Sequence, residues 1–127
     1  MFKSFAYFQD KVSGWLLYCF AESVCTARKE RTFRFLEEAL ELCQSLEMSK
    51  EDAISVVDYV YGRDKGEPHQ EVGGVCVTLA ALCWNEGIEM EDAAFDELNR
   101  INQPEIVQKI RAKQNAKSAV GMGMPTD

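Results

Sequence analysis

Residues 72–84 have the sequence VGGVCVTLAALCW, the most apolar stretch of the chain. Pro68 precedes the stretch and favours the first turn of a helix, and Gly87 follows it and favours the end of one. The apolar side chains would lie on most sides of this helix instead of along one stripe. A helix of that kind belongs at the centre of a bundle. We therefore expect a helix over residues 68–87 in the middle of the fold.

The rest of the chain also has helical periodicity and no strand-like alternation. Ser49 is typical of a helix N-cap, and Asp52 three residues later gives a variant of the capping box. The helix that begins there should end near Gly62. The other helices are expected over residues 7–24, with a break at 24–26, and over residues 28–46, 89–101 and 104–117.

These segments predict an all-α fold, with a four-helix-bundle core flanked by N- and C-terminal helices. A chain of 127 residues suits one compact domain, expected over residues 1–117. Residues 118–127 have turn formers without periodicity, so a disordered tail is expected there. No apolar run reaches the roughly 18 residues that a membrane span needs, and the N-terminal segment lacks the apolar run of a signal peptide. A cytoplasmic protein without membrane contact is expected.

Charge is distributed unevenly along the chain. Residues 37–97 hold 16 acidic residues against 3 basic ones, whereas both ends carry a net positive charge. An acidic centre disfavours direct binding of nucleic acid, which needs a basic stripe. It suits a metal site that binds an anion through the metal. The five cysteines include no CxxC pair, so reduced thiols are expected instead of a zinc site.

The acidic cluster lies within residues 35–42, FLEEALEL. Glu38 and Glu41 are three residues apart, and Glu37 and Glu41 are four apart, so a helix places them on one face. Like charges at these spacings repel, and a divalent cation would convert the repulsion into attraction. Mg²⁺ prefers such hard oxygen ligands and keeps waters that substrate phosphates can replace. The alternative interpretation is a solvated acidic helix face.

A further carboxylate, Glu71, begins the most apolar helix of the chain. Gly73 and Gly74 follow it, and glycine inside a helix is unfavourable by roughly 1 kcal/mol relative to alanine. The two glycines either allow close helix packing or leave room for a ligand. Glu71 itself either faces an ion or partner, or is a first-turn charge that favours the helix dipole.

Together these motifs resemble the MazG-like all-α nucleoside triphosphate pyrophosphohydrolase superfamily, over about residues 28–115. That family pairs an ExxE motif with an ExxD motif on antiparallel helices. Glu38-Ala-Leu-Glu41 matches the first motif, within the segment RFLEEALEL that is also similar to the family. Glu71-Val-Gly-Gly74 aligns with the second, which is degenerate because Gly74 replaces the aspartate.

The resemblance implies Mg²⁺, or alternatively Mn²⁺, bound by Glu38, Glu41 and Glu71, with Glu37 and Glu38 as catalytic residues. It implies hydrolysis of a ribo- or deoxyribonucleoside triphosphate between the α- and β-phosphates, to a monophosphate and pyrophosphate. Asp58, on an otherwise apolar helix, is either an extra ligand that compensates for Gly74 or a helix-surface aspartate. The candidate phosphate-binding residues are Arg31, Arg34, Lys109, Arg111 and Lys113.

The family also assembles into oligomers, so a homo-oligomer, dimer or tetramer, is expected. Two alternatives to the enzyme stay open. The first is a catalytically degenerate relative, a helical bundle that binds a nucleotide or a protein partner without turnover. The second is an unrelated helical interaction module whose acidic face is only solvated.

Overall fold

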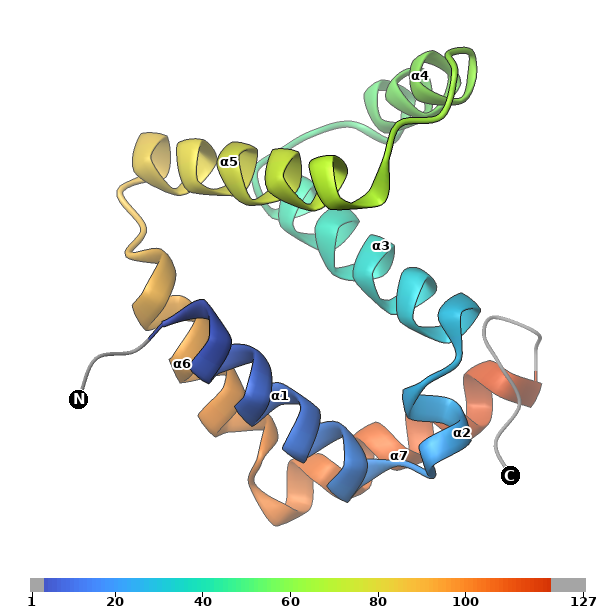
Figure 1. Cartoon of the computed structure of the whole chain (residues 1–127), viewed down its shortest axis with the longest axis vertical. Helices are drawn as coiled ribbons and strands as arrows, with labels where there is room; N and C mark the ends of the chain where they lie inside the picture. The colour runs from blue at the N-terminus through green and yellow to red at the C-terminus, as the bar shows by residue number, and fades with distance from the viewer. Residues whose placement is uncertain (1–3, 120–127) are drawn as a thin grey trace. The chain divides into compact units, whose positions relative to one another are not determined.

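The computed structural model describes residues 4–119, and this part of the chain is built of helices joined by short loops, as the sequence predicts (Figure 1). No strand occurs within it. None of its helices is long and apolar enough to cross a membrane. The helices are α1 (Phe5–Cys19), α2 (Glu22–Cys25), α3 (Arg28–Ser45), α4 (Lys50–Tyr61), α5 (Pro68–Glu86), α6 (Met90–Ile101) and α7 (Pro104–Ala119).

Local signals begin several helices where the sequence predicts. The Ser49 side chain accepts a hydrogen bond of 3.1 Å from the backbone N–H of Asp52, which confirms the expected N-cap of α4. Pro68 lies in the first turn of α5, and the Glu67 carboxylate accepts from the N–H of Gln70 at 3.0 Å. These side chains satisfy backbone donors that the first helical turn leaves without partners.

Helices α3 and α5 end in the same backbone motif with different residues. Gly87 follows α5 at φ 68°, in the left-handed region that glycine adopts without strain. Glu47 follows α3 at φ 71°, where a side chain is unfavourable. Both are Schellman ends, closed by hydrogen bonds of 3.1 Å from Met48 N to Cys43 O and 2.9 Å from Ile88 N to Cys83 O.

The described chain forms two compact units. Unit 1 comprises residues 4–37 and 94–119, which hold α1, α2, the first part of α3, most of α6 and α7. Unit 2 comprises residues 38–93, which hold the rest of α3, α4, α5 and the beginning of α6.

Unit 1 is held together by contacts of α1. Helix α1 packs against α2 and α7, and Val24 and Val107 are almost fully buried. The ring of Phe8 meets that of Phe95 edge to face at 5.1 Å. The indole Nε1 of Trp15 donates to the carbonyl of Ile101 at 3.0 Å, so it supplies a partner at the end of α6.

The first helix is shorter than expected. The sequence predicts one helix over residues 7–24, whereas α1 ends at Cys19, Phe20 is extended, and α2 begins at Glu22. Arg111 of α7 donates to the carbonyls of Tyr18 and Cys19 at 2.6 and 2.9 Å. A distant side chain therefore supplies partners for carbonyls at the end of α1 and favours its termination there.

Unit 2 leaves most of its apolar side chains exposed. No residue of α4 is buried, and Cys83 is the buried residue of α5. Val72 is 64% exposed, Val77 69% and Trp84 85%. Unit 2 by itself therefore does not supply the covered bundle centre that the sequence predicts for residues 68–87.

The last helix runs slightly beyond its expected end. Helix α7 continues through Ala119, so Ser118 and Ala119 are helical although the sequence places them in a tail. The remainder of the expected tail, residues 120–127, lies outside the described residues.

Candidate functional site

The three glutamates of the first acidic motif all lie on α3, an uninterrupted helix at this point. Glu38 and Glu41 are exposed, and their separation of three residues places them on neighbouring positions of one face. The Glu37 side chain is 37% exposed. Next to this face, Leu36 and Leu40 are also about half exposed. The acidic face therefore borders an apolar surface instead of lying opposite it.

Upstream of this face, α3 carries a chain of ion pairs. Glu30 is completely buried. Its carboxylate lies 3.1 Å from Nε of Arg34, and Nη1 of the same arginine lies 3.0 Å from the Glu37 carboxylate. Arg31 also reaches Glu30, at 3.4 Å. Two of the arginines that the sequence offers as phosphate ligands are therefore paired with carboxylates of their own helix.

Glu71 lies in the first part of α5 and is exposed. Its carboxylate turns back over the preceding loop, where a Cβ added at Gly66 would collide with it. Gly66 thus leaves the space that the Glu71 carboxylate occupies. The hydroxyl of Thr78 donates to the carbonyl of Gly74 at 2.9 Å, so this threonine is bonded to its own helix backbone.

The paired glycines of α5 have no close neighbours. A Cβ built at Gly73 or Gly74 meets no heavy atom within 4 Å. Close helix packing within the chain therefore does not require glycine at either position. The side chain of an aspartate at position 74 would also have room, although this sequence has glycine there.

Carboxylate oxygens from Glu38, Glu41 and Glu71 have the chemistry that Mg²⁺ prefers. Across residues 4–119, however, the side chains of the single chain do not bring three or more potential metal ligands together. Asp58, the candidate extra ligand, is exposed on α4, so no burial penalty demands a cation beside it. These carboxylates therefore have the right chemistry for a hard dication, but the described residues do not bring them together in a single chain.

The candidate phosphate ligands all belong to unit 1. Lys109 and Lys113 are exposed on α7, four residues apart and so on one helix face. Arg111, on the same helix, instead binds the carbonyls at the end of α1. Of the five basic residues, these two lysines are the most accessible to an anion.

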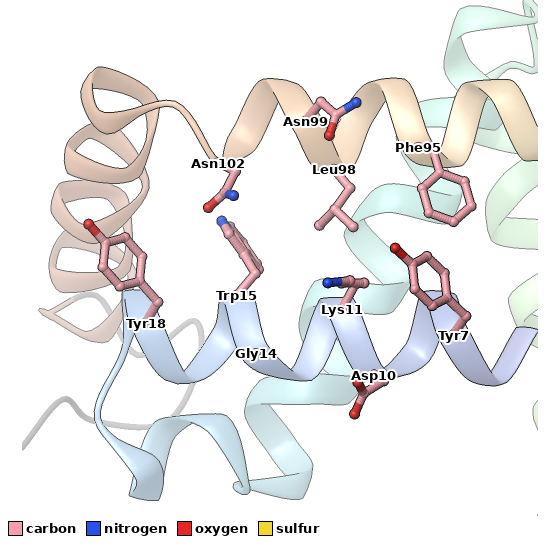
Figure 2. A pocket seen from close by; sticks show the side chains of 10 residues that line it. All are labelled: Tyr7, Asp10, Lys11, Gly14, Trp15, Tyr18, Phe95, Leu98, Asn99 and Asn102. Atoms are coloured by element: carbon pink, nitrogen blue, oxygen red, sulfur yellow. The ribbon is translucent and has the colours of Figure 1, made fainter. Parts of the chain in front are cut away.

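A cavity of about 590 Å³ lies between α1 and α6 of unit 1. Figure 2 shows Tyr7, Lys11 and Trp15 of α1 pointing toward α6, with Asp10 turned away. A Cβ at Gly14 would meet no atom within 4 Å. Gly14 is a glycine inside a predicted helix, and this is the sequence feature that could have indicated the cavity. Its lining is Tyr7, Asp10, Lys11, Gly14, Trp15, Tyr18, Phe95, Leu98, Asn99 and Asn102.

Two cysteines of unit 1, Cys19 and Cys25, lie in surroundings that favour the protonated thiol. Burial raises the pKa of Cys19 above its usual value, although Arg111 acts in the opposite direction. Burial also raises the pKa of Cys25, partly offset by Arg31. A raised pKa leaves less thiolate at neutral pH, and the thiolate is the reactive form.

No protein-family model matches this chain, and neither a curated protein nor a solved structure is significantly similar to it. The case for a function therefore rests on the chain's own residues.

Proposed function

We propose that the protein is a Mg²⁺-dependent nucleotide pyrophosphohydrolase that cleaves nucleoside triphosphates between the α- and β-phosphates. The observation that carries the proposal is the face of α3 with three glutamates, Glu37, Glu38 and Glu41, beside exposed apolar residues. Carboxylates at these spacings on one helix face repel one another, and a dication would turn that repulsion into attraction.

Each acidic residue has a role in this proposal. Glu38 and Glu41, with Glu71 from α5, hold the cation. Mg²⁺, when bound, would supply positive charge for the phosphates and activate a water. Glu37 and Glu38 would orient the attacking water and accept its proton. The reaction yields a nucleoside monophosphate and pyrophosphate, and the exposed Lys109 and Lys113 are the chain's best candidates to bind the remaining phosphate charge.

We further propose that the protein works as a homo-oligomer. Helices α4 and α5 expose valines, Ile54 and aromatic side chains over most of their length. Exposed apolar surface of this extent marks an interaction site, and a second copy of the chain would cover it.

The test is pyrophosphate release from a panel of ribo- and deoxyribonucleoside triphosphates with Mg²⁺ or Mn²⁺. Glu38→Gln should lower turnover at least about 100-fold, because a metal ligand is lost. Glu89→Gln, which removes an equally exposed carboxylate outside the motif, should stay within about twofold of the wild type. Turnover that survives Glu38→Gln would refute the assignment.

A second candidate function is nucleotide binding without turnover, and Gly74 is the observation that favours it. Calorimetry would then detect nucleotide binding while no pyrophosphate is released. Because the space at position 74 is open, Gly74→Asp should fold and would restore the missing carboxylate. Turnover that appears only in Gly74→Asp would identify the wild type as a catalytically degenerate relative. A wild type that binds neither metal nor nucleotide would instead favour the hypothesis of a helical interaction module.

A further inference from the structure

Glu30, Arg34 and Glu37 form a chain of ion pairs that ends at a proposed catalytic residue. Glu30 Oε2 lies 3.1 Å from Arg34 Nε, and Arg34 Nη1 lies 3.0 Å from Glu37 Oε1. The three residues are spaced by four and by three along α3, so they follow one face of the helix. All three belong to unit 1.

Exposure rises steadily along this chain of ion pairs. The Glu30 side chain is 0% exposed, Arg34 is 19% exposed and Glu37 is 37% exposed. A buried carboxylate is fixed by its surroundings and retains a strong pull on a cation, because water screens it little. Glu30 therefore anchors the Arg34 guanidinium, and the anchored guanidinium holds the accessible carboxylate of Glu37.

The Glu97–Arg100 ion pair on α6 provides a comparison for the Arg34–Glu37 pair. Glu97 and Arg100 on α6 have the same three-residue spacing and a distance of 2.8 Å, but both side chains are more than half exposed. Such surface pairs hold neither partner firmly. The Arg34 pair differs because it is anchored from the protein interior.

From this geometry we infer that Arg34 is a positioning residue for Glu37, in place of the phosphate ligand that the sequence suggests. The inference rests on the proposed function, since it assigns Arg34 a part in that same reaction. Arg34 keeps the Glu37 carboxylate at a fixed place beside the metal-binding pair Glu38 and Glu41. The planar guanidinium engages two carboxylates through different nitrogens, which a lysine ammonium reproduces only in part.

The test measures kcat and KM for pyrophosphate release by the full chain carrying Arg34→Gln. We expect kcat to fall by about 10- to 100-fold, the usual effect of losing a partner that orients a site residue, and KM to change by less than about threefold. Arg34→Lys should restore part of kcat. Adding Arg34→Gln to Glu37→Gln should cause little further loss, because Arg34 acts through Glu37.

Arg100→Gln is the matched control, because it breaks an ion pair of the same spacing whose two side chains are more than half exposed. Its kcat should equal that of the wild type. A rise in KM with unchanged kcat in Arg34→Gln would show that Arg34 contacts phosphate and would overturn the inference. Losses from Arg34→Gln and Glu37→Gln that multiply would overturn it as well, as would a kcat equal to that of the control.

Failure of the inference is distinguishable from failure of the proposed function. A wild-type chain without turnover on any triphosphate overturns the proposed function, and the positioning role in catalysis with it. Turnover that Glu38→Gln abolishes and Arg34→Gln leaves intact overturns the inference alone. Melting curves recorded by circular dichroism identify any variant that fails to fold, and Arg34→Lys, which retains the charge, then supplies the deciding measurement.

Discussion

In unit 1, two polar side chains, Glu30 and Gln114, are among the most buried groups of the protein, whereas in unit 2 most large apolar side chains of α4 and α5 are exposed. Unit 1 pairs its buried charge with arginines of the same helix and ties α1 to α7 through Arg111. Unit 2 has few buried side chains of its own.

The difference shows where each unit finds its partners. A buried carboxylate is tolerated only with partners in place, and unit 1 supplies them from its own residues. Apolar surface gains stability only when something covers it, and α4 and α5 bury few of their side chains. Unit 1 also exposes large apolar side chains, Phe5 and Leu17 among them, but it has buried ion pairs that unit 2 does not show among the described residues. The contrast supports the proposal that another copy of the chain covers α4 and α5. Four predictions test this contrast.

The largest effect is expected for Val77→Asp, which places a charge on the exposed apolar surface of α5. If a second copy covers Val77, the dissociation constant of the oligomer should rise by more than about 100-fold, because burying an unpaired carboxylate costs several kcal/mol. Leu17→Asp alters an α1 residue of unit 1 with similar exposure and should leave the molecular mass of the oligomer unchanged. Analytical ultracentrifugation measures this mass for both variants. An equal mass for the wild type and Val77→Asp would refute the contrast.

In unit 1, Glu30→Ala should lower the free energy of unfolding by about 3 kcal/mol. The change removes a buried carboxylate and leaves Arg31 and Arg34 without this partner. Glu22→Ala removes an exposed acidic side chain of the same unit and should change stability by less than about 0.5 kcal/mol. Urea denaturation followed by circular dichroism gives both values, and equal small losses would show that Glu30 is not an anchor.

In unit 2, the Schellman ends of α3 and α5 allow two opposite substitutions to be compared, each with a smaller expected effect on stability. Glu47→Gly should raise the free energy of unfolding by about 1 kcal/mol, because glycine relieves a side chain in the left-handed region. Gly87→Ala should lower it by a similar amount for the converse reason. If each variant shows a single urea transition, moved up by Glu47→Gly and down by Gly87→Ala, the two units unfold together. If two transitions are seen and only one of them moves, the two units unfold separately.

The smallest effect is expected at the Glu97–Arg100 pair. The hydrogen bonds from Arg100 lower the pKa of Glu97 below its usual value, so folding favours the ionised carboxylate. This stabilisation is present above the ordinary glutamate pKa and disappears as the pH falls through the lowered value. Arg100→Gln should therefore cost at most about 0.5 kcal/mol at pH 7, with no difference from the wild type in strong acid. A constant difference at every pH would exclude the ion pair as its cause.

Local chemistry explains why much of the fold can be predicted from the sequence. Ser49, Pro68 and Gly87 act through backbone groups within a few residues of themselves, so the limits of α4 and α5 follow from short stretches. The acidic face of α3 is equally local, because helical spacing alone places Glu38 and Glu41 together. The function assigned to that face stays a prediction, since the comparisons bring no related protein to it.

The helical class, the limits of most helices and the place of the acidic face all follow from the amino-acid sequence. The end of α1 at Cys19, the burial of Glu30 and the position of Arg34 between two carboxylates become visible only in the folded chain. The end of α1 and the burial of Glu30 depend on residues that are far apart in the sequence. Arg111 reaches Cys19 from 92 residues away, and burial depends on segments that no local pattern identifies.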